Sequence, residues 1–405
     1  MTGRQRVLQA LRHEEPDRIP IDLGAMMSTG IMGIAYNALK EYLGLKKGRT
    51  RMYDLMQQLA EPEPAVLETI GADVVPLLVN EPGVWKPSRL PDGSSCEVPE
   101  WFEPERQEDG SQVLRDTSGR ITARMPADGY YFDNVYHPLK SAGSIAELRE
   151  QLRQILPDVP RTGDMDNLHE RAQYIYDNTE YAVMLNGAGS IYESSQGLRG
   201  WDTFMMDLAG DEELAGVLLD ELVDSHMRRL EKILPAVEGL VQIIQVGDDL
   251  GMQDGPQLSP ALYRKVVKPR HKRFYGYIKK KTASWETDVY LFLHTCGSVY
   301  EFIPDFIEAG VDILNPVQVS ARDMNTARLK KEFGDDISFW GGGCDTQHVL
   351  PFGTPQEVED EVISRIENLA SGGGFIFNQC HNIQSDVPPE NIMAMYKTVE
   401  QYGAY

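Results

Sequence analysis

The segment VYLFLHTCG, residues 289–297, is a continuous apolar run that ends in a histidine and a cysteine. An uninterrupted run is typical of a parallel strand covered on both faces, whereas a strand with one exposed face alternates apolar and polar residues. Seven other runs along the chain have a similar character and a similar length. They occupy residues 18–24, 72–79, 181–187, 241–249, 311–317, 337–343 and 374–380.

Amphipathic segments follow most of these runs. Residues 212–234, 259–281 and 354–370 carry apolar residues at helical spacing, and the last of them opens with a threonine, a proline and acidic residues, as helices often do. Eight strands that alternate with helices predict a (β/α)8 TIM barrel formed by residues 1–405 as a single domain. A doubly wound open sheet is the alternative, and the lack of G-x-G-x-x-G after an early strand counts against it.

Residues 81–140 interrupt this alternation. They are rich in Pro, Gly, Asp and aromatic residues, and short alternating pieces flank a Ser-Gly turn at 118–119. We therefore predict a β-hairpin-rich insertion after the second strand, on the catalytic rim of the barrel. Two roles stay open for it: a lid over the site, or a passive surface excursion.

Bulk composition limits the classes of partner. The net charge of −23 repels nucleic acid and anionic membranes. No apolar run approaches the ~20 residues that cross a bilayer, and the N-terminal residues lack the apolar core of a secretion signal. Four cysteines are too few for a disulfide scaffold. These features predict a cytoplasmic protein that acts on a small molecule.

The end of the 289–297 run predicts a metal site. His294 and Cys296 are two residues apart, so they project to the same face of a strand. Cys380 ends the last predicted strand, which closes back towards the others in a barrel. One histidine and two cysteines are ligands that zinc prefers, and three protein ligands leave a position open for catalysis. Cys344 is a rival third thiolate, and His381 could serve as a ligand or as the partner of one.

The metal interpretation has a plain competitor, because a buried free cysteine is often only a small apolar filler. Other polar residues close strand-like runs, where barrel enzymes place groups that bind substrate. Each could instead cap a helix or a turn. The candidates for substrate binding are Asp22, Asn186, Asp249 and Asn315, and Asp248 is the candidate catalytic residue of this group.

Three stretches resemble the uroporphyrinogen decarboxylase superfamily: RVLQALRHEEPDRIPID (6–22), DDLGMQDGPQLSPALYRKVVKPRHKRF (248–274) and WGGGCDTQHVLPFGTPQEVEDEV (340–362). They span nearly the whole chain in the right order, and the resemblance implies a (β/α)8 barrel. The decarboxylase branch has an arginine-rich R-Q-A-G-R motif after the first strand. Here that stretch reads LGAMMSTGIMG (23–33), without arginine. A substrate with many carboxylates needs cationic groups, so this departure counts against decarboxylation.

The other branch of the superfamily consists of corrinoid-linked methyltransferases, in which an H-x-C pair and a distant cysteine hold zinc, and this chain resembles that branch. The matching positions here are His294, Cys296 and Cys380. The resemblance implies a zinc-dependent O-demethylase component that moves a methyl group from a methoxylated, aryl methyl ether substrate to Co(I) of a corrinoid (cobalamin) protein. Asp248, Asp249 or His381 would protonate the product.

The corrinoid is expected on a separate protein, because the chain lacks a D-x-H-x-x-G signature; the nearest stretch is DTQH (345–348). Three alternatives stay open. They are a methylcobamide:thiol methyltransferase of the coenzyme M type, a uroporphyrinogen decarboxylase-like decarboxylase, and a binding protein that keeps the barrel only as a scaffold.

Overall fold

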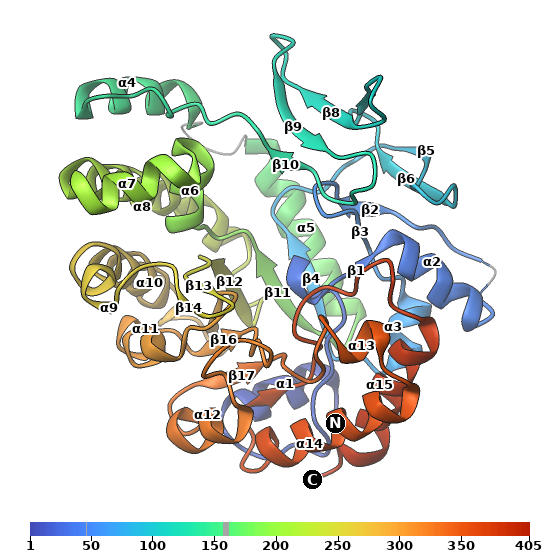
Figure 1. Cartoon of the computed structure of the whole chain (residues 1–405). Helices are drawn as coiled ribbons and strands as arrows, with labels where there is room; N and C mark the ends of the chain where they lie inside the picture. Colours follow the sequence, from blue (N-terminus) through green and yellow to red (C-terminus); the bar gives the residue numbers. More distant parts are fainter. Residues whose placement is uncertain (46, 157–161) are drawn as a thin grey trace.

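A parallel sheet forms the centre of the molecule. The computed structural model describes residues 1–45, 47–156 and 162–405. Seven strands follow the order β18-β17-β16-β15-β12-β11-β4, and helices surround them (Figure 1). The strands are β4 (Val74–Leu78), β11 (Ala182–Asn186), β12 (Ile243–Gly247), β15 (Tyr290–His294), β16 (Ile313–Asn315), β17 (Ser338–Trp340) and β18 (Phe375–Ile376). Each lies within one of the predicted apolar runs.

Residues 18–24 fill the eighth position, between β18 and β4. The backbone N–H of Asp22 donates to the carbonyl of Phe377 at 2.9 Å, and the N–H of Phe377 donates to Pro20 at 2.8 Å. On the other side, the N–H of Asp73 donates to the carbonyl of Ile21 at 2.8 Å. The first predicted run therefore joins both edges of the sheet. The predicted (β/α)8 barrel is confirmed, and the open doubly wound sheet is excluded.

Two apolar layers lie on either side of the sheet. The interior of the barrel holds Phe292 of β15 and Trp340 of β17, and α1 (Gly3–Leu11) closes its lower end with Val7 and Leu11. The outer layer packs the sheet against the helices and includes Leu291 and Leu293. Alternate residues of β15 thus face inward, which directs residues 294 and 296 toward the axis of the barrel mouth.

The helical periodicity in the sequence predicted the main helices correctly. Residues 212–234 and 354–370 form α8 (Glu212–Ala236) and α14 (Pro355–Leu369), and Thr354 and Glu357 cap α14 reciprocally. Residues 259–281 form α9 (Pro260–Leu262), a π-helical turn (Tyr263–Val267) and α10 (Lys268–Thr282). The turn precedes Pro269, which has no N–H to donate.

The remaining helices cover the outside of the sheet and the rim (Figure 1). They are α2 (Gly33–Tyr42), α3 (Pro64–Ile70), α4 (Ile145–Ile155), α5 (Thr162–Asn178), α6 (Tyr192–Arg199), α7 (Trp201–Gly210), α11 (Ile303–Ala309), α12 (Thr326–Phe333), α13 (Val349–Phe352) and α15 (Pro389–Tyr402). Within the described ranges, no helix combines the length and the apolar character that crossing a membrane requires.

The insertion forms two small antiparallel sheets at one edge of the barrel (Figure 1). β5 (Trp85–Arg89) pairs with β6 (Ser95–Pro99). β7 (Glu105–Arg106), β8 (Gln112–Arg115), β9 (Ile121–Met125) and β10 (Asp133–Asn134) form the second sheet. The β8–β9 hairpin turns at the predicted Ser-Gly pair. The hairpin-rich insertion after the second barrel strand is therefore confirmed.

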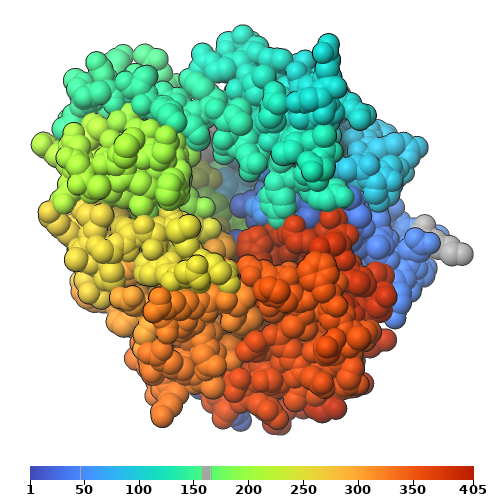
Figure 2. Space-filling model, in the orientation of Figure 1, coloured from blue at the N-terminus to red at the C-terminus, as the bar shows by residue number. Residues whose placement is uncertain are grey.

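The insertion also reaches the mouth of the barrel. The hydroxyl of Tyr131 donates to Asn382 Oδ1 at 3.1 Å, and Gln384 donates to that hydroxyl at 2.7 Å. Asn382 and Gln384 follow β18, on the carboxyl-terminal side of the sheet. In the space-filling view, the surface is hollowed where the insertion, the segment around α6 and the loop after β18 meet (Figure 2).

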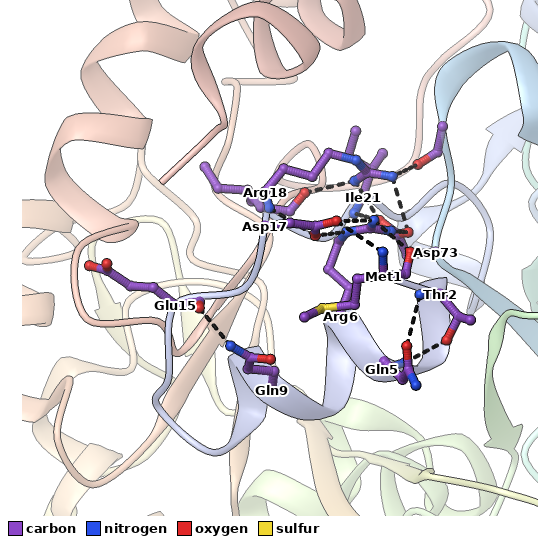
Figure 3. Close-up of polar contacts among 12 residues, drawn as sticks. Met1, Thr2, Gln5, Arg6, Gln9, Glu15, Asp17, Arg18, Ile21 and Asp73 are labelled. Atoms are coloured by element: carbon purple, nitrogen blue, oxygen red, sulfur yellow. Dashed lines mark hydrogen bonds and ion pairs between the residues drawn. The ribbon is translucent and has the colours of Figure 1, made fainter.

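A buried carboxylate ties the opposite end of the barrel together (Figure 3). Asp73 is 1% exposed and accepts from Arg6 at 2.5 Å, from Arg18 at 2.7 Å and from the N–H of Ile21 at 2.9 Å. Arg6 also pairs with Asp17 at 2.6 Å. The carboxylate of Asp73 thus connects α1, the first barrel segment and the start of β4, at the end of the barrel opposite to the mouth.

Candidate metal centre

The donors of a metal site come together at the end of β15. His294 ends the strand, Cys296 follows on the same face, and His294 Nε2 lies 3.3 Å from Cys296 Sγ. One donor atom from each of His294, Cys296 and His381 lies within 4.8 Å of the other two. Donors of a tetrahedral zinc site are about 3.5 Å apart. The three residues could therefore hold one ion after small side-chain shifts.

Asn315 fixes the chemical form of His294. The side-chain NH2 of Asn315 donates to the carbonyl of Trp340 at 2.9 Å, so its Oδ1 faces His294 Nδ1 at 2.7 Å. An oxygen acceptor at this place requires a proton on Nδ1, which leaves the lone pair of Nε2 free. A metal-ligating histidine usually has a partner of this kind on its other nitrogen. The arrangement fits a metal ligand.

Two more oxygen atoms lie close to Nε2 of His294. Ser28 Oγ is 3.0 Å away, and Asp249 Oδ1 is 3.6 Å away. Asp249 Oδ1 also accepts the backbone N–H of Cys296 at 2.7 Å. Asp249, predicted to bind substrate, thus lies beside the metal donors. Ser28 was not predicted, because the only signal in the 23–33 segment is its lack of arginine.

The electrostatics of the site favour a cation. Burial, and then the carboxylates of Asp249 and Glu193, raise the pKa of the Cys296 thiol well above its ordinary value. A thiolate would therefore form here only with a positive charge beside it. A divalent cation supplies that charge. The donor set and its surroundings fit zinc.

His381 has the properties of a ligand rather than those of an acid. Burial lowers its pKa to about 4, and the nearby His294 adds to the effect. The imidazole is therefore neutral at neutral pH, with a lone pair for a metal and no extra proton to give. Of the roles predicted for His381 (metal ligand, partner of a ligand and proton donor), these properties favour the ligand, and the role of proton donor stays a prediction.

The structure places Cys380 outside the group of three donors. Its Sγ donates to the carbonyl of Val317 at 3.3 Å, and burial raises its pKa to about 12. Cys380 still lines the same cavity of about 320 Å³ as His381. Cys380 as third ligand therefore stays a prediction. Cys344, the rival, is fully buried and donates to Glu361 at 3.4 Å, away from the donors.

Asp248 does not have the contacts of a catalytic acid. It is 2% exposed, and its carboxylate accepts hydrogen bonds from the Ser190 hydroxyl and from the backbone of residues 191–193 at the start of α6. His271 Nε2 lies 2.8 Å from the other side of the carboxylate. The capping role that the sequence left open is the one that this geometry supports. A catalytic role for Asp248 stays a prediction.

Three residues predicted to bind substrate make hydrogen bonds within the framework, and substrate binding by them stays a prediction. Asp22 is fully buried and accepts from the N–H of Ala25 at 2.9 Å and from the indole of Trp340 at 2.8 Å. Asn315 is fully buried and orients His294. Asn186 is 9% exposed and donates to the carbonyl of Ala25 at 2.8 Å. Buried polar groups need partners, and here backbone groups and neighbouring side chains supply them.

Glu193 is a candidate that the sequence did not reveal. It lies in the first turn of α6, and burial together with the carboxylates of Asp249 and Asp248 raises its pKa above the ordinary value. A carboxyl group in such surroundings holds a proton near neutral pH. The signal is absent from the sequence, because the start of α6 meets the end of β12 only in the folded barrel.

Comparison with known proteins supports the same fold and family. Residues 186–402 match the family model described as uroporphyrinogen decarboxylase (URO-D). The uroporphyrinogen decarboxylase of Hahella chejuensis is 27% identical over 197 residues, which are 48% of this chain and 50% of that protein. That of Geobacter metallireducens is 24% identical over 206 residues, 51% of this chain and 54% of that protein. The chain thus spans about half the length of these curated relatives.

A solved structure extends the likeness over the whole chain. A methyltransferase from Methanosarcina mazei superposes with a TM-score of 0.58 and 18% identity, and the alignment covers 100% of both chains. At this identity, the likeness concerns the fold. Since the family model matches more than half of its residues, the chain belongs to the uroporphyrinogen decarboxylase family.

Proposed function

We propose that this protein is a zinc-dependent methyltransferase that moves a methyl group from a methoxylated small molecule to Co(I) of a separate corrinoid protein. The observation that carries the proposal is the meeting of His294, Cys296 and His381 donors at the barrel mouth. Three protein ligands of these types leave a coordination position open. The fold shared with a methyltransferase from Methanosarcina mazei supports this branch of the family.

Decarboxylation of a polycarboxylate is less well supported, although the curated relatives carry that name. The 23–33 segment after the first barrel position has no cationic side chain, and it places Ser28 beside His294. Asp249 adds negative potential at the same place. Like charges repel most strongly where water is excluded, so a substrate rich in carboxylates would be disfavoured here.

The residues of the site divide the work between them. A bound zinc ion would act as a Lewis acid that polarises the methyl-bearing oxygen. Asn315 holds His294 in the tautomer that presents Nε2 to the open centre of the site. Asp249 fixes the backbone at Cys296, and the protonated carboxyl of Glu193 is the candidate donor to the departing oxygen.

Aromatic residues of the insertion support a flat, apolar substrate such as an aryl methyl ether. Tyr131 bonds to Asn382, the neighbour of His381, so the insertion lies against the loop that carries a metal donor. The hollow at this face leaves the mouth open for a corrinoid protein to approach (Figure 2). The separate corrinoid protein stays part of the proposal.

The first test is elemental analysis of purified protein. We expect about one zinc per chain in the wild type, since the donors form a single site. Cys296→Ala should lose the ion. Cys96→Ala is the matched control, because Cys96 is also a free cysteine but lies in the insertion on β6. Zinc absent from the wild type would contradict the proposal.

The second test is methyl transfer. In separate reactions, the zinc-loaded protein is incubated with cob(I)alamin and a methoxyarene, or with methylcobalamin and a free thiol, and the visible spectrum of methylcobalamin is followed. We expect methylcobalamin to form from a methoxyarene in the wild type and Cys96→Ala, and not in Cys296→Ala. Methyl transfer only between methylcobalamin and a free thiol would replace the O-demethylase assignment by the thiol-methylating alternative.

A further inference from the structure

The cavity that contains Cys380 and His381 has a wall of neutral polar side chains. Its volume of about 320 Å³ is that of a small-molecule site. Loops that follow β16, β17 and β18 form the wall, on the carboxyl-terminal side of the sheet. Because His381 is also one of the three metal donors, a ligand in this cavity lies beside the metal centre. The other described residues of the wall are Gln318, Ser320, Thr346, Gln347, Asn382 and Gln384.

Two amides of this wall are committed to contacts within the protein. Gln318 accepts a backbone N–H at 2.7 Å and donates to Gln253 at 3.0 Å. Asn382 accepts from the hydroxyl of Tyr131 at 3.1 Å and donates to Gln57 at 2.7 Å. These bonds hold Gln318 and Asn382 in place, so recognition of a ligand falls to the other polar groups of the wall.

Three side chains of the wall still have hydrogen bonds to offer. The hydroxyl of Thr346 and Oε1 of Gln384 have no partner among the described residues, and neither atom is enclosed in the core. The side chain of Gln347 is exposed and makes one long contact, 3.5 Å to Gln253. Amide oxygens only accept, whereas a hydroxyl can accept or donate. The open positions therefore suit a ligand group that donates hydrogen bonds.

Charged ligand groups do not match this wall. An ionised carboxylate only accepts hydrogen bonds, so it would leave Gln384 Oε1 unpaired. The described wall residues include no Lys, Arg, Asp or Glu, and transfer of a carboxylate or an ammonium group from water is costly without a counter-charge. A bound zinc ion would not supply that charge to a carboxylate. Its two charges are balanced by the Cys296 thiolate and by Asp249, which lies 3.6 Å from His294 Nε2.

We propose that the methoxylated substrate carries a neutral group that donates hydrogen bonds, a carboxamide or a hydroxyl, and that this group binds in the cavity of Thr346, Gln347 and Gln384. The inference rests on the proposed methyl transfer and narrows it to uncharged substrates. A carboxamide N–H donates to Gln384 Oε1, and the carboxamide oxygen accepts from the Thr346 hydroxyl.

The test compares three probes that share one methoxylated ring: 3-methoxybenzamide, 3-methoxybenzoate and methoxybenzene. Binding to the zinc-loaded protein without cobalamin is measured by calorimetry near pH 7, where the benzoate is ionised. We expect the amide to bind at least about tenfold more tightly than the benzoate. We expect it to bind about three- to tenfold more tightly than methoxybenzene, since one net hydrogen bond contributes a factor of this size.

Two variants locate the neutral group. Thr346→Val keeps the shape of the side chain but removes its hydroxyl, so it should weaken the amide about three- to tenfold and leave methoxybenzene unchanged. Gln347→Lys adds a cation to the wall and should strengthen benzoate binding about tenfold. Gln356→Lys is the control, because it makes the same charge change at an exposed position of α14 outside the cavity and should leave the preference intact.

The zinc content of every sample is measured first, so that a lost metal is not mistaken for a lost contact. The inference is overturned if the benzoate binds as tightly as the amide, if no probe binds at millimolar concentration, or if Thr346→Val leaves the amide affinity intact. Methyl transfer to cob(I)alamin from the benzoate but not from the amide would also overturn it, while the proposed methyltransferase would stand. Selective amide binding without transfer from any methoxyarene would contradict the proposed function and the substrate role with it.

Discussion

Replacement of Asn315 by leucine is the most direct test of the metal centre, because Asn315 touches His294 without being a ligand. The change keeps the volume of a fully buried side chain but removes the oxygen that lies 2.7 Å from His294 Nδ1. His294 can then carry its proton on Nε2, the atom that faces Cys296 at 3.3 Å. A proton on Nε2 competes directly with a metal.

The expected effect is a loss of zinc affinity of about 10- to 100-fold, the usual range when the partner of a ligating histidine is removed. This factor corresponds to about 1.4–2.7 kcal/mol of binding free energy. The assay is a titration of apo-protein with zinc against a chromophoric chelator at fixed pH. Thermal unfolding of the apo-protein, measured in parallel, separates metal affinity from general loss of stability.

Asn391→Leu is the matched control. Asn391 is 1% exposed and donates to the carbonyls of Leu350 and Gly353 at 2.9 and 2.8 Å, far from the donors of the metal. Both variants should lower the unfolding temperature, because each leaves backbone carbonyls unsatisfied. If zinc affinity were equal in the two variants, the orienting role of Asn315 would be refuted.

Three further outcomes are expected. His381→Ala should lose zinc while Cys380→Ser retains it, as measured by elemental analysis; the reverse result would show that Cys380 turns from its Val317 contact to become the third ligand. Burial raises the pKa of Asp22 to about 7, so the folded state binds more protons than the unfolded state between about pH 4 and 7, and the stability contributed by this group falls as pH rises through that window. Asp22→Asn should remove that pH dependence in denaturant titrations, and above pH 7 its free energy of unfolding should exceed that of the wild type by up to about 4 kcal/mol. An unchanged pH profile of stability would contradict the raised pKa. Asp73→Asn should cost roughly 3–5 kcal/mol of unfolding free energy, because it leaves two guanidinium groups without their carboxylate, whereas Asp288→Asn, in an exposed pair, should cost less than about 1 kcal/mol; equal losses would refute the buried network.

The fold was predictable because parallel barrel strands are buried on both faces. This leaves uninterrupted apolar runs, and all eight lie where the structure has a barrel position. The run at 18–24 shows the limit of the signal. Proline interrupts it, and the structure joins it to its neighbours through a few backbone bonds instead of a regular strand. The periodicity predicts the place of a segment in the barrel better than the regularity of its hydrogen bonds.

The pairing of His294 with Cys296 followed from the two-residue period of β15, and the structure keeps them on one face. The same reasoning was weaker for Cys380, because β18 ends at Ile376 and the chain beyond it follows loops. Cys380 and His381 are adjacent, so a shift of one residue in this loop replaces a thiol by an imidazole at the metal site. Sequence spacing therefore predicted where the third donor would come from, but not which of the two neighbours faces the metal.

The residues at strand ends show why a polar side chain at a barrel mouth is not sufficient evidence of substrate binding. The hydrogen bonds of three such residues go to protein groups: those of Asp22 to a turn, those of Asn315 to a histidine and those of Asp248 to the start of a helix. These bonds make the donor cluster rigid, which catalysis at a metal requires. Recognition of the substrate must then come from polar groups that do not already make all their hydrogen bonds within the protein. The insertion around Tyr131, which lies against the loop of His381, is where we expect exchange of side chains to change substrate preference without changing zinc content.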